Sequence, residues 1–279
     1  MTVPLQGIGT ASILGSHGRR DSERAIRSAL DAGIRHFDTA RSYGWGEAEA
    51  VLGPLLKRVP RDEIVLVSKC GLVPVRQSTA LRFAKAAARR LIATFPSMRA
   101  HVQRAASNQA VQPARTYDLA TLDRSVRESL ANLATPYLDV LLLHNFEAGK
   151  PGLAEVVAWM RTLQSQGTIR AYGFSVEGDI IPDLEWLADE GLLDGAVIQT
   201  PLVDALLHLP PRFAATEFIV HSPFRYLQSI REQRPGVTFV DLLREVSHAI
   251  KCRAIVCSMF SESHRVQNIA AVKSAFAAA

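Results

Sequence analysis

The sequence predicts an α/β protein of the (β/α)8 TIM-barrel class, built as a single domain over residues 1–279. Eight short apolar runs alternate with segments of helical spacing, which favours parallel strands joined by right-handed crossovers. The chain has 279 residues, and a barrel of eight such units typically needs about 250. The glycine-rich turn of a competing open sheet is incomplete, because Gly7-Ile8-Gly9-Thr10-Ala11-Ser12 lacks a third glycine.

The repeating unit is a strand, a turn and a helix. The strand candidates are Leu5–Gly9, Ile34–Phe37, Ile64–Ser68, Leu138–Leu143, Ala171–Phe174, Ala196–Gln199, Glu217–Val220 and Ala254–Cys257. The helix candidates are Ser22–Ala32, Glu47–Lys57, Leu119–Leu133, Leu153–Gln166, Ile180–Asp189, Val237–Ile250 and Glu262–Phe276. The first helix shows the logic, since Ala25, Ile26 and Ala29 share one face and Gly33 follows as a cap.

A long basic insert, residues 71–117, interrupts this alternation after the third strand. It contains eight Lys or Arg, no acid, and one helix candidate, Thr79–Phe95. Removing those eight from the 32 basic residues leaves 24 against 27 acidic ones, so the net charge of +5 belongs to this segment. Three interpretations stay open: a lid over the pocket that favours anionic substrates, a docking site for an acidic partner such as a carrier domain, or a solvated insert.

Composition indicates a cytoplasmic protein without a membrane span. No apolar run reaches the roughly 20 residues that cross a bilayer, and Met1–Gly15 lacks the regions of a signal peptide. Cys70, Cys252 and Cys257 have neither paired spacing nor neighbouring histidines, so we expect reduced thiols and no metal site. No nucleic-acid motif is present, and no nucleic-acid partner is expected.

Polar residues directly after apolar strands are the candidates for chemistry, because the carboxyl ends of barrel strands surround one pocket. The four that stand out, one after each of the second, third and fourth strands and one in the second loop, are Asp38, Lys69, His144 and Tyr43. Singly, each has an ordinary alternative, such as a turn cap for Asp38 or a solvated charge for Lys69. Together they predict a catalytic site.

The predicted chemistry follows from charge. Tyrosine has an ordinary pKa of about 10, and a nearby ammonium favours its phenolate, so we expect Lys69 to lower the pKa of Tyr43. Asp38 would balance the lysine, and His144 would orient a substrate oxygen. A proton donor without a nucleophile suits reversible carbonyl and alcohol chemistry, with hydride from a nicotinamide.

The same residues carry a family resemblance. Asp31–Gly44, followed by Gly46-Glu47-Ala48-Glu49 and Leu52-Gly53, resembles the aldo-keto reductase signature around the catalytic aspartate and tyrosine. Ser68-Lys69 and Leu142-Leu143-His144 are similar to the family's lysine and histidine segments. The resemblance runs from about Gly7 to Ala271. It implies an NAD(P)(H)-dependent oxidoreductase acting on a small aldehyde, ketone or sugar hemiacetal.

The resemblance also implies a cofactor site. Ser175 and Gln199 match residues that hold the nicotinamide amide, while Val176 replaces the family's usual Asn and His221 replaces a stacking tyrosine. The other implied cofactor residues are Ser222, Phe224, Ser258, Phe260, Ser261, His264, Arg265, Gln267 and Asn268. NADPH-preferring relatives tend to carry a cation near the positions of Ser258 and His264, and Arg265 is the substitute candidate. Both dinucleotides therefore stay open, with NADP(H) slightly favoured over NAD(H).

Two other functions are weighed against this one. A regulatory or docking subunit that binds cofactor with little turnover would explain Val176 and His221. A phosphate-binding barrel isomerase would need a glycine-rich loop after the seventh strand, which Ser222-Pro223-Phe224-Arg225 does not provide.

Overall fold

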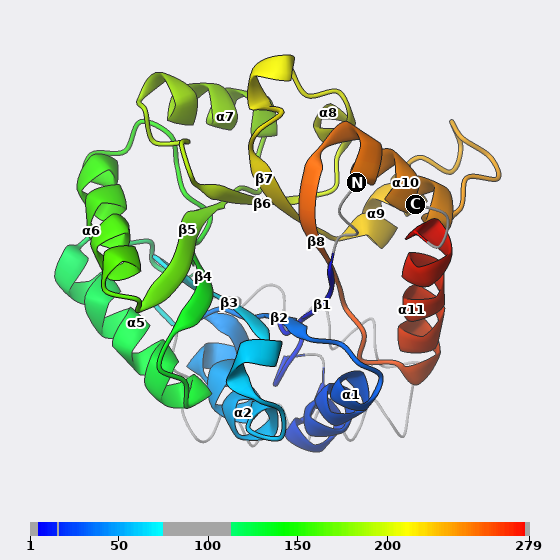
Figure 1. Ribbon diagram of the computed structural model, residues 1–279, viewed down its shortest axis with the longest axis horizontal. Helices are drawn as coiled ribbons and strands as arrows, with labels where there is room; N and C mark the ends of the chain where they lie inside the picture. Colours follow the sequence, from blue (N-terminus) through cyan, green and yellow to red (C-terminus); the bar gives the residue numbers. More distant parts are fainter. Residues whose placement is uncertain (1–4, 16, 75–112, 277–279) are drawn as a thin grey trace, which may run out of the picture.

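Eight parallel strands close into a barrel that is surrounded by helices (Figure 1). The computed structural model describes residues 5–15, 17–74 and 113–276. The strands are β1 (Leu5–Gly9), β2 (His36–Asp38), β3 (Val65–Cys70), β4 (Leu138–Leu143), β5 (Ile169–Ser175), β6 (Val197–Pro201), β7 (Glu217–His221) and β8 (Lys251–Cys257). Each strand pairs with the next along the chain, and β8 pairs with β1. The predicted fold class is confirmed.

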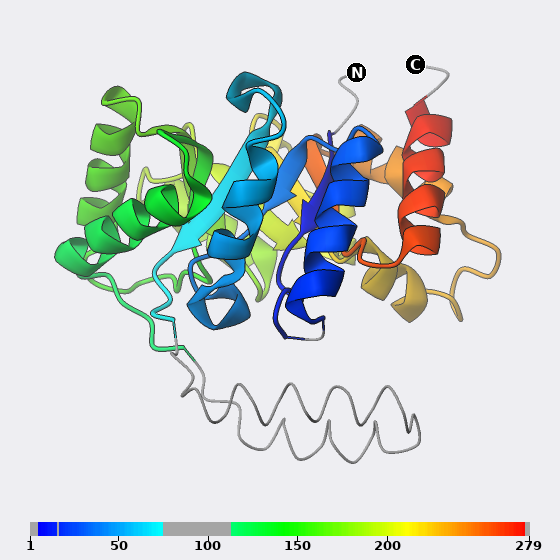
Figure 2. The same cartoon turned by 90° about the horizontal axis from the view of Figure 1, so that it is seen from below.

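Helices follow most strands and pack against the outside of the barrel (Figure 2). They are α1 (Arg19–Asp31), α2 (Ala48–Leu56), α5 (Leu119–Leu133), α6 (Leu153–Ser165), α7 (Ile180–Asp189), α8 (Asp204–Leu207), α9 (Pro223–Ser229), α10 (Phe239–Ala249) and α11 (Glu262–Phe276). Short 3-10 turns occur at Tyr43–Gly46, Arg61–Glu63 and Pro211–Phe213. Among these described helices, none is long and apolar enough to cross a bilayer.

Helix ends are fixed by local sequence. Gly33 follows α1 with φ of +85°, a conformation that costs glycine little, and its amide donates to Leu30. Asp118 begins α5, where its carboxylate accepts from the amide of Thr121 at 2.9 Å. Helices α8 and α9 were not predicted, because four and seven residues are too few to show a helical period.

Two apolar layers hold the barrel together. The larger one lies between strands and helices, and it includes Phe37, Phe174 and Phe218. The smaller one fills the barrel interior and consists of Val67, Val140, Leu142, Val197, Ile219, Ala254 and Val256. Residues two apart on a strand share a face, so the two layers alternate along each strand.

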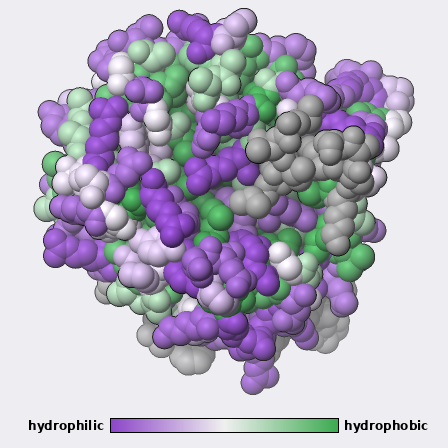
Figure 3. Space-filling model, in the orientation of Figure 1, coloured by the Kyte–Doolittle hydropathy of each residue, from purple (hydrophilic) through white to green (hydrophobic). Residues whose placement is uncertain are grey.

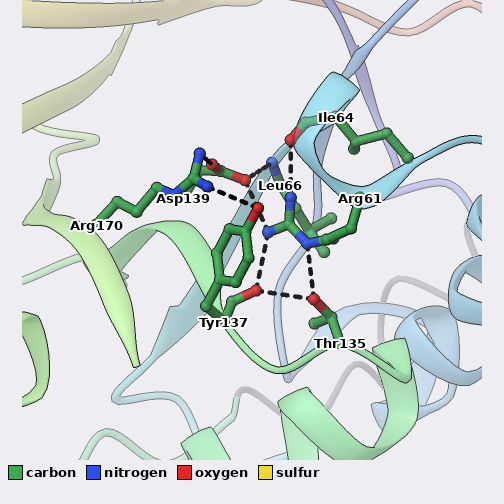
Figure 4. A network of polar contacts seen from close by, with 7 residues as sticks. All are labelled: Arg61, Ile64, Leu66, Thr135, Tyr137, Asp139 and Arg170. Carbon is green, nitrogen blue, oxygen red and sulfur yellow. Dashed lines mark hydrogen bonds and ion pairs between the residues drawn. The ribbon is translucent and has the colours of Figure 1, made fainter. Parts of the chain in front are cut away.

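A polar network lies near the amino ends of β3, β4 and β5 (Figure 4). The carboxylate of Asp139 on β4 is buried and lies 2.8 Å from Arg61 and 3.1 Å from Arg170. It also accepts from the backbone amide of Leu66 at 2.9 Å, which ties β4 to β3. The ring of Tyr137 lies close to both guanidinium groups, at 3.8 and 4.2 Å from its centroid. Figure 3 looks onto this end of the barrel and shows hydrophilic side chains across much of the face.

The basic insert is described only at its two ends. Residues 71–74 and 113–117 run antiparallel, with Leu72 bridged to Arg115 and the amide of Val73 donating to Ala114 at 2.8 Å. The predicted helix Thr79–Phe95 lies outside the described residues. Whether the segment is a lid, a docking site or a solvated insert therefore stays a prediction.

Candidate active site

On five strands, β3, β4, β6, β7 and β8, the inward face carries an apolar residue in the barrel and a polar one at or just after the carboxyl end. Val67 precedes Lys69, Leu142 precedes His144, Val197 precedes Gln199, Ile219 precedes His221, and Val256 precedes Ser258, each by two residues. Since side chains two apart on a strand point the same way, these polar groups are carried to one end of the barrel. The same strand orientation that buries the apolar residues in the barrel therefore directs these polar side chains toward the candidate site.

Asp38 lies at the centre of this group. Its Oδ1 accepts from Lys69 Nζ at 2.6 Å, and its Oδ2 accepts from Gln199 Nε2 at 2.6 Å. Asp38 is only 4% exposed and Lys69 only 2%. Two short bonds to opposite oxygens hold the carboxylate in one orientation, and its charge offsets the buried ammonium.

Lys69 connects the aspartate to Tyr43. Its ammonium donates to the carbonyl of Thr39 at 2.9 Å and to the hydroxyl of Tyr43 at 3.3 Å. Three acceptors therefore occupy the three protons of the ammonium. Tyr43 itself begins a 3-10 turn in which Gly44 adopts φ of +56°, a left-handed conformation that glycine takes at little cost.

His144 completes the group. Its ring meets the Tyr43 ring edge-on at 5.6 Å between centroids, and its Nδ1 lies 3.4 Å from the hydroxyl of Ser42. Burial, the charge of Lys69 and that of His221 lower the pKa of His144 to about 2, so its ring is neutral at physiological pH. A neutral imidazole can donate one hydrogen bond and accept another. The structure therefore brings together all four residues predicted for catalysis.

The pKa of Tyr43 departs from the sequence expectation. Burial raises the pKa above its ordinary value, and this outweighs the lowering by Lys69. The sign of the lysine effect was predicted correctly, but the net direction was wrong, because the buried ring is shielded from water. Burial alone lowers the pKa of Lys69, yet Asp38 and Tyr43 together raise it above its ordinary value. The tyrosine thus keeps its proton, beside an ammonium that keeps its charge.

A pocket of about 760 Å³ opens above these residues and extends from the barrel mouth to α11. Nine of the residues predicted for cofactor binding line it: Ser175, Gln199, His221, Ser222, Phe224, Ser258, His264, Gln267 and Asn268. Asp38, Tyr43 and His144 line its inner end. This volume falls within the range of about 300 to 1,000 Å³ that is typical of ligand pockets.

Three predicted cofactor residues are not in this lining. Arg265 is 5% exposed and donates to the carbonyl of Met259 at 3.1 Å and to the hydroxyl of Ser28. Phe260 stacks on His17 at 4.7 Å between ring centroids, and Ser261 lies within hydrogen-bonding distance of Ser263, at 2.8 Å between hydroxyls. The Arg265 side chain therefore attaches α11 to α1 rather than facing the pocket.

Sequence reasoning missed two charged residues that line the pocket, Arg225 and Glu177. Arg225 lies in the first turn of α9, a helix too short to predict, and Glu177 follows the Ser175 segment by two residues. Val176, which lies between Ser175 and Glu177 in sequence, is buried in the outer core, so its side chain is turned away from the pocket. Their position in the sequence could have revealed them, because Glu177 follows β5 and Arg225 follows β7, and the carboxyl ends of both strands were predicted to belong to the site.

Two further observations bear on what the pocket can hold. Asn268 is 3% exposed, yet its Nδ2 has no hydrogen-bond partner within the described residues. A buried donor without a partner costs about 1–3 kcal/mol, which a ligand acceptor would relieve. The free thiol of Cys70, beside Lys69, is buried and its pKa is raised to about 12, so it is a packing group and not a nucleophile.

Comparisons with known proteins point to one family. The sequence model of the Aldo/keto reductase family matches residues 7–203, which include Asp38, Tyr43, Lys69 and His144. An NADH-specific methylglyoxal reductase of Escherichia coli (strain K12) is 30% identical over 182 residues, which cover 62% of this chain and 48% of that protein. A D-threo-aldose 1-dehydrogenase of Pseudomonas sp is 27% identical over 192 residues, covering 66% and 52%.

Solved structures show the same fold. An aldo-keto reductase from Klebsiella pneumoniae, in complex with NADP and acetate, superposes with a TM-score of 0.62 at 23% identity, covering 97% of this chain and 86% of that one. The alignments span about half the length of the two curated relatives. More than half of this chain is nevertheless matched by one family. The chain therefore belongs to the aldo/keto reductase family.

Proposed function

We propose that this protein is a nicotinamide-dependent oxidoreductase that interconverts a small carbonyl compound and its alcohol. The observation that carries the proposal is the position of Lys69 Nζ, 2.6 Å from Asp38 and 3.3 Å from the Tyr43 hydroxyl, beside a pocket that Asp38, Tyr43 and His144 line. Its relatives include a methylglyoxal reductase and an aldose dehydrogenase, which supports a small carbonyl or sugar substrate.

The residues that line the pocket fit a dinucleotide. The unpartnered Nδ2 of Asn268 at the outer end suits an aromatic nitrogen or ribose oxygen, and Ser175 and Gln199 at the inner end suit a carboxamide. When bound, the cofactor would supply or accept the hydride. One relative is described as NADH-specific and one structural neighbour contains NADP, so relatives use either dinucleotide.

In the proposed reduction, Tyr43 donates its proton to the carbonyl oxygen. Because burial raises the pKa of Tyr43, the donor is protonated at neutral pH. The phenolate that forms lies beside the ammonium of Lys69, which stabilises the new charge without moving. Asp38 and Thr39 hold that ammonium in place. His144, neutral and against the Tyr43 ring, can donate to the same substrate oxygen and orient it.

We also place the protein in the cytoplasm, where its three cysteines, which are free and buried, would stay reduced. Its partners would be small molecules. The acidic partner proposed for the basic insert has no support from the described residues.

The test is a titration of the purified protein with NADH and NADPH, followed by quenching of its three tryptophans and by cofactor emission. Binding of either, with turnover on a panel of small aldehydes, ketones and aldoses, is expected. Binding without turnover across that panel would instead favour a cofactor-binding subunit. No binding of either dinucleotide would contradict the proposal.

A further inference from the structure

Charge is unevenly distributed along the pocket. In the described part of the chain, Arg225 is the one lysine or arginine among the lining residues, and Asp38 and Glu177 are the acids. Arg225 lies in the first turn of α9, which follows β7, whereas the outer end of the pocket is formed by α11 and the residue after β8. This described cation is therefore carried by a different element from the outer end.

Among the residues that the structure describes, none of those lining the outer end is a lysine or arginine. Ser258 after β8, together with His264, Gln267 and Asn268 on α11, forms this end. All four are serine, histidine or amide residues, which hydrogen-bond a hydroxyl well. This end lies beyond residues 7–203, so the family match does not determine its specificity.

The nearest arginine in sequence is already engaged. Arg265 is buried, and its guanidinium donates to Met259 and Ser28, so it joins α11 to α1. The other ionised residue between Ser258 and Asn268 is Glu262, whose charge would repel a phosphate. Turning Arg265 outward would break both hydrogen bonds and expose the helix contact.

We propose that this pocket selects NADH over NADPH, with Arg225 facing the diphosphate; the inference rests on the proposed function. Both dinucleotides share the diphosphate, a group that the guanidinium of Arg225 suits. NADPH adds a 2′-phosphate, a monoester group with a charge of about −1.5 to −2 at neutral pH. At an outer end built from neutral groups, that charge would lose water without gaining a cation, whereas the 2′-hydroxyl of NADH needs only hydrogen bonds. This reverses the slight preference for NADP(H) that the sequence suggested.

The first experiment compares the affinities of the two reduced dinucleotides by isothermal titration calorimetry at pH 8, where an ordinary imidazole is neutral. NADH is expected to bind at least about tenfold more tightly, a difference equivalent to one missing charge-assisted contact. Equal or tighter binding of NADPH would overturn the inference and leave the proposed function standing. If neither NADH nor NADPH binds, both the inference and the proposed function are wrong.

A gain-of-affinity variant tests the outer end directly. His264→Arg places a cation on an exposed position that lines the pocket, and it is expected to tighten NADPH binding about tenfold while changing NADH less than about twofold. Val266→Arg is the matched control, because Val266 is 62% exposed on the same helix but does not line the pocket. If both variants act alike, the outer end does not receive the 2′-phosphate.

The role of the Arg225 cation is tested by Arg225→Gln. This change is expected to weaken NADH and NADPH by the same factor, about tenfold, and to reduce the salt dependence of both. Arg231→Gln, an exposed change outside the lining, is the control and should alter neither affinity. A loss confined to NADPH would show that Arg225 meets the 2′-phosphate, and the inference would be wrong.

Discussion

Lys69 on β3 and Asp38 on β2 form a buried ion pair, with Nζ 2.6 Å from Oδ1 and both side chains almost fully withdrawn from solvent. The two strands are neighbours in the barrel, so the pair joins them directly above the interior core. Such a pair has consequences for stability as well as for chemistry, because either charge alone would be costly at this depth.

Removing the lysine should therefore damage both properties. Lys69→Met is expected to lower the free energy of unfolding by about 3–5 kcal/mol, because Asp38 remains buried without its counter-charge. Turnover should be lost together with the charge beside Tyr43. Urea unfolding measures the first effect and steady-state kinetics the second. The double variant Asp38→Asn, Lys69→Met should be more stable than the single one; equal stabilities would contradict the role of the pair.

The Tyr43 hydroxyl should matter for the reaction and little for binding. Tyr43→Phe is expected to reduce turnover by about 10²–10⁴, the usual contribution of a general acid. The affinity for dinucleotide should change little, because the ring remains packed against His144. Single-turnover kinetics and a binding titration measure the two separately. A variant that keeps a tenth of the wild-type rate would show that another group supplies the proton.

Three histidines, of which His36 and His144 are buried and His221 is partly exposed, predict sensitivity to acid. Burial, as the largest cause, lowers the pKa of His36 and His221 to about 4 and that of His144 to about 2. Unfolded, each ring would take up a proton near pH 6.5, so the unfolded state binds more protons below that pH. Stability that is fully present above pH 6.5 is thus lost as pH falls toward 4. Each ring adds a slope of about 1.4 kcal/mol per pH unit, measurable by urea unfolding at several pH values.

His36 is the ring to substitute in that test. It lies against Gly7 inside the barrel, and neither of its ring nitrogens has a partner in the described structure. His36→Leu should therefore flatten the pH dependence by one histidine's share without orphaning another group. His248→Leu, at an exposed position, is the control and should leave the slope as it is. An unchanged slope in His36→Leu would show that this ring is not neutral in the folded protein.

The network around Asp139 should stabilise the fold without affecting the chemistry. Asp139→Ala leaves Arg61 and Arg170 without their shared carboxylate and the Leu66 amide without its acceptor. The expected loss is about 3–5 kcal/mol of unfolding free energy, with turnover unchanged at temperatures where the variant is folded. Glu245→Gln, which breaks a surface ion pair with Arg234, should cost less than about 1 kcal/mol. Similar losses in both variants would contradict a special role for Asp139.

Much of the barrel could be predicted from sequence because its strands carry their own signal. Leu138–Leu143 matched in both bounds, since a run that is apolar except for Asp139 is typical of a strand buried on both faces. Asp38, Lys69 and His144 were found because a polar residue after such a run must lie at the strand end. Position along the chain was sufficient for these residues.

The direction in which a side chain points and the degree to which it is buried were harder to predict. Arg265 was placed on the correct helix, but sequence does not say whether a guanidinium turns outward or toward Ser28. The lowering of the Tyr43 pKa by Lys69 was expected, yet the larger effect of burial depends on the packing of several loops at once. Arg225 was missed because α9 is too short to show a pattern. These features arise from contacts between segments distant in sequence.

The pairing of β1 with β8 also sets the order in which the protein can become functional. Leu5 of β1 pairs in register with Ala254 of β8, so the barrel cannot close until the last strand is in place. During synthesis, the residues of the inner end emerge from the ribosome long before Ser258 and α11. A nascent chain would therefore hold Asp38, Lys69 and His144 for many seconds without the outer half of the pocket, and with β1 as an open edge. Cofactor cannot help the early stages of folding, and its stabilising effect arrives only after the final strand has docked.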